Sequence, residues 1–287
     1  MFFTLTEVLL LAKRIRLSPK AVSEELRGWH WNEPPIYHSS TYFLNVSDLT
    51  NGFCETGRYV HLKHKGVKPE IPEGVNDIHY VYSEGIQTIK RLIYEEGENM
   101  SGNRLRTLMT DEFYRVMANV HDVEKAKILW DHITNIYSAE IDKYKAKQFL
   151  TRDSLVSLII PFHVEYPIDG SLVGLQSNIR ADAFVPLIPL IAEMKTGKQR
   201  RAHELSLVGY ALAIESQFEI PIDFGYLCYV IVDKSVLTNC RLIHISDSLR
   251  SDFLEVRDRG FEAIETDPGM PKRCDDSCPF LRHCNKL

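Results

Sequence analysis

The chain has 287 residues, of which 44% are apolar, 10% aromatic and 25% charged. These are ordinary values for a globular protein, so the composition excludes a disordered chain, a collagen-like fibre and a small disulfide-rich scaffold. No stretch approaches the roughly 18 consecutive apolar residues that a membrane span requires. Glu7 stands where a signal peptide carries bases. We therefore expect a cytoplasmic protein without membrane association.

The overall charge is mildly acidic, with 34 Lys and Arg against 39 Asp and Glu and a formal net charge of −5. A protein that wraps duplex DNA through phosphate contacts alone is usually basic overall. Binding of nucleic acid would therefore require a local basic groove or metal ions.

The first part of the chain is predicted to be mainly helical. Apolar residues recur at helical spacing over residues 2–15, whereas residues 28–35 break the periodicity and resemble an aromatic-rich loop. Residues 46–62 have the pattern of one capped helix, with Ser47 as the N-cap and Cys54 inside the helix.

The remaining elements follow in a regular order. Two longer helical runs are expected over about residues 77–96 and 111–149. Apolar runs then indicate three β-rich segments, at residues 156–165, 178–185 and 187–194. A helix, two strands of a hairpin and a last helix are predicted over residues 200–217, 225–232, 241–245 and 246–265.

This order predicts an α/β (α+β) fold, in which a sheet is framed by helices. We expect one interlocked globular unit with three parts. They are a mainly helical region over residues 1–150, a core over residues 151–265 and a cysteine-rich tail over residues 266–287.

The most informative chemistry is an acidic pair with a lysine, at Asp182, Glu193 and Lys195. Residues i and i+2 of a strand face the same side, so Glu193 and Lys195 should project together, and a hairpin would bring in Asp182. Two carboxylates at one point repel each other, and a hard divalent cation relieves that repulsion. An ammonium beside them can orient water and stabilise charge on a phosphate. The pattern therefore indicates phosphodiester hydrolysis.

A simpler interpretation is an exposed Glu-x-Lys on a strand, beside an unrelated aspartate. The apolar character of these strands argues against it, because their ionisable residues should then be largely buried. Basic residues follow at the start of the next helix, where a DNA backbone could lie: Lys198, Arg200 and Arg201.

This arrangement resembles the PD-(D/E)XK nuclease superfamily, specifically its RecB-like branch, which implies a restriction-endonuclease-like core with a mixed sheet. In that branch a helix after the acidic strands carries a Gln–apolar–x–x–Tyr motif. Tyr210 matches the tyrosine, whereas Ser206 stands at the glutamine position and is a departure. His203, two helical turns before Tyr210, is a candidate for the missing polar role. A half-buried structural tyrosine is the competing interpretation for Tyr210.

RecB-like nucleases also carry a helical histidine upstream that approaches the metal. The resemblance assigns this position to His79, at the start of a predicted helix. His61, His64 and His163 compete for the role, and a lone histidine is often only a surface or core residue.

Three of the six cysteines, Cys274, Cys278 and Cys284, lie in the last fourteen residues. In an intracellular chain such clustering favours a metal or iron–sulfur site over disulfides. A four-ligand site needs one more thiolate, for which Cys54 is the candidate. The spacing does not separate zinc from an iron–sulfur cluster, and unligated thiols are a third interpretation.

One N-terminal and three C-terminal cysteines around an Asp…Glu-x-Lys core resemble the CRISPR-associated RecB-like iron–sulfur nucleases, in particular their archaeal type I-A adaptation-module variant. The resemblance covers nearly the whole chain. It implies a 4Fe–4S cluster on the four cysteines and Mg²⁺ or Mn²⁺ on Asp182 and Glu193, with His79 as a further ligand. Lys195 would position or activate the water, and Tyr210 would support the substrate or the site.

The resemblance also implies an activity. It predicts a metal-dependent DNA exonuclease that trims single-stranded ends from the 5′ end and prepares fragments for CRISPR spacer acquisition. The expected partners are the CRISPR integrase and other proteins of the adaptation module. The alternative is a non-catalytic DNA-end-binding or scaffold subunit with a degenerate nuclease site, and Ser206 favours it.

Two smaller features of the sequence each allow two interpretations. Trp29 and Trp31 could stack on unpaired bases or could simply pack the loop that contains them. Cys228 and Cys240 fall on predicted strands, where they fit either small buried apolar side chains or a hairpin disulfide.

Overall fold

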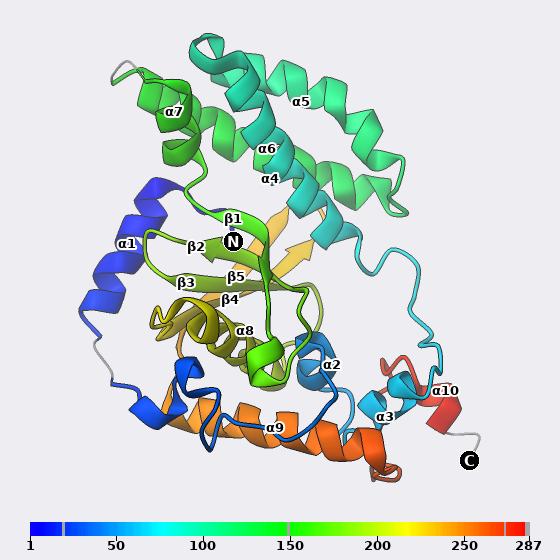
Figure 1. Cartoon of the computed structure of the whole chain (residues 1–287). Coiled ribbons are helices and arrows are strands. Elements are labelled where there is room, and N and C mark those ends of the chain that lie inside the picture. Colours follow the sequence, from blue (N-terminus) through cyan, green and yellow to red (C-terminus); the bar gives the residue numbers. More distant parts are fainter. Residues whose placement is uncertain (19–20, 148–149, 273, 285–287) are drawn as a thin grey trace.

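The computed structural model describes residues 1–18, 21–147, 150–272 and 274–284 (Figure 1). A five-stranded sheet lies at its centre, in the order β1 (His163–Ile168), β2 (Ile179–Val185), β3 (Leu190–Lys195), β4 (Phe224–Val232) and β5 (Val236–His244). Neighbouring strands are antiparallel except β3 and β4, which are parallel. Helix α8 (Ala202–Phe218) connects these two strands. The predicted mixed α/β fold class is confirmed.

One side of the sheet is covered by a group of four helices: α4 (Asp77–Glu96), α5 (Gly102–Met117), α6 (Val123–Lys145) and α7 (Arg152–Ile159). Figure 1 shows them together beyond β1. Their buried faces form one apolar cluster with one face of the strands. Trp130 anchors this cluster, since it is 2% exposed and its indole N–H donates to the Met109 carbonyl at 3.0 Å.

The opposite side is covered by α8 and α9 (Asp247–Glu265), which form a second apolar cluster with the other face of the sheet. Helix α8 is buried on nearly every side, which explains why its residues are apolar around the whole helix rather than along one stripe. The sheet therefore separates two cores, and α8 fixes the position of β3 relative to β4.

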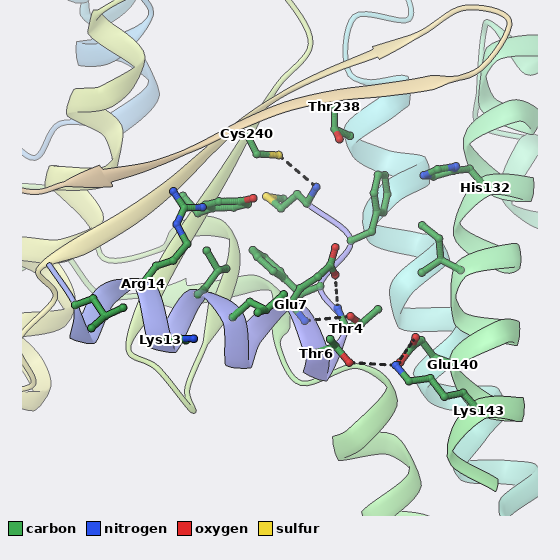
Figure 2. Close-up of a pocket in the computed structure, with 18 residues that line it drawn as sticks. Thr4, Thr6, Glu7, Lys13, Arg14, His132, Glu140, Lys143, Thr238 and Cys240 are labelled. Carbon is green, nitrogen blue, oxygen red and sulfur yellow. Dashed lines mark hydrogen bonds and ion pairs between the residues drawn. The ribbon is translucent and has the colours of Figure 1, made fainter. Parts of the chain in front are cut away.

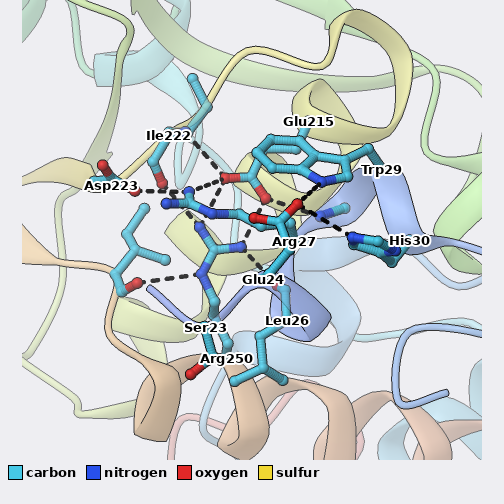
Figure 3. A network of polar contacts seen from close by, with 12 residues as sticks. Ser23, Glu24, Leu26, Arg27, Trp29, His30, Glu215, Ile222, Asp223 and Arg250 are labelled. Carbon is cyan, nitrogen blue, oxygen red and sulfur yellow. Dashed lines mark hydrogen bonds and ion pairs between the residues drawn. The ribbon is translucent and has the colours of Figure 1, made fainter. Parts of the chain in front are cut away.

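A buried ionic network joins the N-terminal segment to α8 and α9 (Figure 3). Glu215 is 0% exposed and accepts from Arg250 at 2.7 and 2.8 Å and from Arg27 at 2.9 Å. The backbone N–H groups of Gly28 and Ile222 also donate to this carboxylate. Because both oxygens are fully satisfied, the burial of this charge is compensated.

The remaining helices are short or terminal. They are α1 (Leu5–Arg16), α2 (Val46–Thr50), α3 (Arg58–His64) and α10 (Leu281–Cys284), with 3-10 turns at Glu24–Leu26, Gly28–His30, Gly97–Asn99 and Ser171–Val173. Helix α1 begins with a capping box, in which Thr4 and Glu7 satisfy each other's backbone N–H groups. Among the described residues, no helix combines the length and the apolar character needed to cross a membrane.

Most predicted elements are present, and three predictions were wrong. Residues 46–62 form α2 and α3 with a loop between them, so Cys54 lies in a loop and the N-cap is Asn45 rather than Ser47. Residues 156–159, expected as strand, continue α7. The run predicted over residues 111–149 is two helices, and its last two residues lie outside the described part of the chain.

Candidate active site

The acidic pair is assembled by the hairpin of β2 and β3, as the sequence predicted. Ala183 pairs with Ala192 in this hairpin, so Asp182 and Glu193 are the next opposed positions. Ile191, two residues before Glu193, packs in the core under α8. Glu193 and Lys195 therefore project from the sheet face that α8 covers.

Glu193 and Lys195 are in direct contact. The Lys195 Nζ lies 2.7 Å from Glu193 Oε1, and the Glu193 side chain is only 6% exposed. Burial and the nearby carboxylate of Asp182 raise the pKa of Glu193 to about 7. The other oxygen, Glu193 Oε2, is buried without a hydrogen-bond partner, which is an unusual state for a carboxylate.

Asp182 links the hairpin to the first turn of α4. Its Oδ2 accepts from the backbone N–H of Met194 at 2.6 Å, and its Oδ1 lies 3.7 Å from His79 Nδ1. Burial, the largest single effect, opposes ionisation of this carboxyl, but the contacts with His79, Lys195 and the Met194 N–H together outweigh it and lower the pKa of Asp182. Of the four histidines considered from the sequence, His79 is thus the one beside the acidic pair.

The other three histidines lie in different surroundings. His61 Nδ1 lies 2.7 Å from the Ala263 carbonyl on α9, and His64 packs edge-on against the Tyr42 ring. His163 is exposed at the start of β1.

Glu165 is a residue of the site that the sequence analysis missed. Val164 pairs with Ala183 and Tyr166 pairs with Ala181, so Glu165 stands opposite Asp182 on the neighbouring strand. Burial and Asp182 raise the pKa of Glu165. Only the register of β1 against β2 reveals this position, because the sequence around Glu165 contains no recognisable motif.

Tyr210 lies on α8 and is 6% exposed. Burial, followed by Glu193 and Asp182, raises its pKa well above the ordinary value, so the phenol stays protonated near the carboxylates. Ser206 is 1% exposed, and its hydroxyl donates to the carbonyl of His203 within the same helix. His203 Nδ1 instead contacts the Tyr229 hydroxyl at 3.1 Å.

The three basic residues after β3 differ in their surroundings. Lys198 is exposed, and the Arg201 side chain is 83% exposed with Asp252 at 3.2 Å. Arg200 instead turns toward the cysteine segment and donates to Asp275 at 2.7 Å. Lys198 and Arg201 are therefore the two accessible members of the predicted DNA-binding set.

Cys54, Cys274, Cys278 and Cys284 are free thiols gathered around the C-terminal tail. Burial raises the pKa of Cys284, and the other three cysteines raise it further, so each of them lies within electrostatic reach of Cys284. Arg58 lowers the same pKa. Its Nε is a buried donor without a hydrogen-bond partner. A group with several thiolate ligands and negative charge fits these residues.

The residue types at the carboxylate site fit a hard divalent cation. The buried Glu193 Oε2 has no partner, and Asp182 supplies oxygen ligands next to it. Within the described residues, no three His, Cys, Asp or Glu side chains already stand in an arrangement that holds a metal ion. One oxygen of Asp182 accepts from the Met194 N–H, and one oxygen of Glu193 accepts from Lys195. Both side chains would therefore have to turn to coordinate a metal ion.

Cys228 and Cys240 form a disulfide between β4 and β5, so the second of the two interpretations from the sequence holds. Trp29 donates to Glu24 at 2.6 Å, and the Arg27 guanidinium lies over its ring. These contacts match the packing interpretation of Trp29, whereas Trp31 is 39% exposed.

A cavity of about 930 Å³ lies between α1, α6 and the strands β4 and β5, with Cys240 in its lining (Figure 2). Its lining mixes acids and bases, among them Glu7, Arg14, Glu140 and Lys143. None of the acidic residues around Asp182 lines it.

Comparison with known proteins shows which family the chain resembles. The family model described as CRISPR-associated exonuclease Csa1 matches residues 1–287. A protein of that name from Saccharolobus solfataricus is 55% identical over 99% of this chain and 100% of its own length. Another of the same name, from Thermoproteus tenax, is 28% identical over 98% of this chain and 99% of its own length.

Proposed function

The chain belongs to the family of CRISPR-associated exonucleases Csa1, and we propose that it is a metal-dependent DNA exonuclease of the cytoplasm. It trims single-stranded ends in the 5′-to-3′ direction and prepares fragments for spacer acquisition, together with the CRISPR integrase and other adaptation-module proteins. The observation that carries the proposal is the convergence of Asp182, Glu193 and Lys195, with Glu193 Oε2 buried and unpartnered.

Asp182 and Glu193 would hold Mg²⁺ or Mn²⁺, and His79 would add a nitrogen ligand from the start of α4. Such a cation polarises the phosphate and lowers the pKa of bound water. His79 sits against Asp182 at 3.7 Å, which keeps the imidazole beside the carboxylate before any ligand binds.

Lys195 and Tyr210 supply the hydrogen-bond donors of the site. The Lys195 ammonium contacts Glu193 with one of its three hydrogens, so two remain to orient water and to stabilise charge on a phosphate oxygen. Tyr210 stays a neutral phenol beside the carboxylates and can support the substrate or the site. Lys198 and Arg201, both exposed after β3, would contact the DNA backbone.

The four free cysteines would hold a 4Fe–4S cluster. The cluster would connect the loop at residue 54 to the tail after residue 274, and closing so long a loop restricts the unfolded chain. Four thiolates would also suit zinc. Metal analysis of protein purified without oxygen decides between the two. About four iron atoms per chain would support the 4Fe–4S cluster, whereas one zinc atom per chain would support a zinc site.

The nuclease proposal is tested with Glu193→Gln and Lys195→Met in the full-length protein. Each variant should lose at least about a hundredfold in Mn²⁺-dependent cleavage of single-stranded oligonucleotides, with an unchanged iron or zinc content. Oligonucleotides labelled at the 5′ or the 3′ end report the direction of digestion. Glu112→Gln is the matched control, because Glu112 is a half-buried carboxylate on α5 that pairs with Arg91. Wild-type activity in both site variants would refute the proposed site.

The non-catalytic alternative draws on one observation. Ser206, at the glutamine position of the motif, donates to the carbonyl of its own helix. If this departure abolishes catalysis, the wild-type protein will bind single-stranded ends in Mn²⁺ without cleaving them. Ser206→Gln would then be expected to restore cleavage.

A further inference from the structure

Strand β5 forms one edge of the sheet, and within the described residues it pairs only with β4. Cys228 and Cys240 are directly opposite each other, and their Cα atoms are 4.0 Å apart. So short a distance is typical of a non-hydrogen-bonded pair, in which the backbone groups of both residues point away from the partner strand. The Ile245 N–H, by contrast, donates to the Asp223 carbonyl. The odd-numbered residues of β5 therefore face β4, and the even-numbered residues face outward.

Every second residue of β5 thus has an N–H and a C=O group that no neighbouring strand uses. By strand alternation, these residues are Val236, Thr238, Cys240 and Leu242. No residue in the described part of the chain forms a hydrogen bond with the backbone of any of the four. A row of unpaired backbone groups is a template for pairing with another chain.

The opposite edge of the sheet is protected against such pairing. Strand β1 has six residues, contains Pro167 and has a positive φ at Glu165. Short length, proline and a distorted backbone are devices by which proteins prevent pairing at an edge. Strand β5 has nine residues, contains neither proline nor glycine, and carries Arg241 as its single Lys, Arg, Asp or Glu. The unprotected edge is therefore β5.

The cavity in Figure 2 borders this free edge. Thr238 and Cys240 line it, and the figure shows both side chains on the side of the strand that faces α1. Its lining also includes Leu10 and Leu17 of α1, which are 58% and 66% exposed, and Ile136 of α6. A strand added to β5 would place every second side chain over this partly apolar groove.

Two basic side chains of the groove have no acidic partner. Lys13 and Arg14 are exposed on α1, and neither forms an ion pair with a carboxylate of the described residues. Figure 2 shows Arg14 reaching from α1 toward the strand. The other charges are engaged, because Lys143 pairs with Glu140 at 3.0 Å and Glu7 belongs to the capping box of α1. The groove therefore favours an occupant with an Asp or Glu.

A second copy of the chain fits this groove poorly. Its β5 could pair along the edge, but Val236, Cys240 and Leu242 of that copy already pack against its own apolar cluster. Those side chains would leave the groove of the first copy unfilled. Strand β5 also lacks the acid that would complement Lys13 and Arg14.

We propose that the free edge of β5 and the adjoining groove bind an extended segment of another protein, which adds to the sheet as a further strand. The segment is apolar at alternate positions and carries an acidic residue that meets Lys13 and Arg14. Backbone hydrogen bonds along the edge give affinity, and the groove gives selectivity. The groove contains none of the carboxylates of the proposed nuclease site, so docking there is independent of cleavage.

The probe is a library of phage-displayed peptides of about ten residues, long enough to span β5, selected on the immobilised full-length protein. The selected peptides should be apolar at alternate positions and contain an Asp or Glu. Made synthetically, they should slow amide hydrogen exchange at Val236, Thr238, Cys240 and Leu242. Peptides without this pattern, or unchanged exchange along β5, would overturn the proposal.

Thr238→Pro is the decisive variant. The Thr238 N–H faces outward, so proline removes a donor of the free edge without breaking the ladder to β4. The melting temperature and the Mn²⁺-dependent cleavage should therefore stay at wild-type values. The affinity for the selected peptides should decrease at least about tenfold, whereas the matched control Thr238→Val, which keeps the N–H, should retain it.

Lys13→Glu/Arg14→Glu changes only exposed side chains of α1 and should also weaken the acidic peptides about tenfold. If Thr238→Pro melts early, this variant decides instead. Wild-type affinity in a folded Thr238→Pro, or in the α1 variant, would overturn the proposal. A wild type that is dimeric in analytical ultracentrifugation, with a monomeric Thr238→Pro, would assign the edge to a second copy and overturn it too. Each of these results leaves the proposed nuclease intact.

Discussion

Arg200 and Asp275 form a 2.7 Å ion pair that ties the start of α8 to the segment between Cys274 and Cys278. The same guanidinium donates to the Gly52 carbonyl at 3.1 Å and to Ser277 Oγ at 3.2 Å, and it lies over the Phe53 ring. One side chain therefore joins the loop before Cys54, the C-terminal cysteines and the connection that follows Lys195.

We expect Arg200→Ala to destabilise the protein by about 2 kcal/mol, because it removes charge-assisted hydrogen bonds of a side chain that is 17% exposed. The variant should also lose its cysteine-bound metal faster to a chelator. Thermal unfolding and the rate of metal release measure the two effects. Arg201→Ala is the control, since that side chain is 83% exposed. Equal melting and release in both variants would show that the Arg200 contacts do not hold the cysteine segment.

Glu215→Gln should destabilise the protein by about 3–5 kcal/mol, because it leaves the buried Arg250 without its counter-charge, whereas Arg27 keeps Asp223 at 2.6 Å. The change is measured by urea unfolding followed by circular dichroism. Glu24→Gln provides the comparison, as Glu24 is exposed and only contacts Trp29 and His30. A Glu215 variant as stable as the Glu24 variant would mean that the network in Figure 3 contributes little.

Local patterns in the sequence were enough to predict the long elements. Helix α4 was predicted over about residues 77–96, and the structure gives it the bounds Asp77–Glu96, with Gly97 at a positive φ where the helix ends. The hairpin of β2 and β3 was recognisable from two apolar runs, so the contact between Glu193 and Lys195 followed from strand alternation alone.

The errors arose where tertiary packing or backbone geometry decides the structure. Residues 46–62 looked helical throughout, but Gly52 and Gly57 adopt φ of 71° and 79° and interrupt the helix around Cys54. The apolar run after residue 154 fits a strand or a buried helix equally well. Glu165 was not singled out because its position opposite Asp182 depends on the register of two strands, which no local pattern specifies. Arg200 was grouped with exposed bases, since the sequence does not show that the tail returns to it.

The disulfide between Cys228 and Cys240 should stabilise the hairpin of β4 and β5. Closing a loop with a sequence separation of 12 contributes about 3 kcal/mol in the chain-entropy description. Reduction with dithiothreitol should therefore lower the melting temperature of the wild type but not of Cys228→Ser/Cys240→Ser. Parallel metal analysis shows whether the reductant disturbs the other four cysteines. An identical decrease in the double variant would assign the effect to those cysteines instead.

His203 makes folding sensitive to acid. Burial, with Lys195 and Arg200 nearby, lowers its pKa from 6.5 to about 4, so the imidazole is neutral in the folded protein. As pH falls below about 6.5, the unfolded chain takes up a proton that the folded protein does not accept until about pH 4. The free energy of unfolding is therefore unaffected by His203 well above pH 6.5, and protonation of the unfolded chain lowers it by about 3 kcal/mol between pH 6.5 and 4.

His203→Gln keeps a polar group near the Tyr229 hydroxyl but does not titrate. Its unfolding free energy should therefore decrease less than that of the wild type between pH 6.5 and 4, and the two proteins should differ little in slope above pH 7. Urea unfolding at a series of pH values measures both slopes, with the exposed His64→Gln as the control. Parallel pH profiles of the His203 variant and the wild type would show that the imidazole is protonated in the folded state as readily as in the unfolded chain.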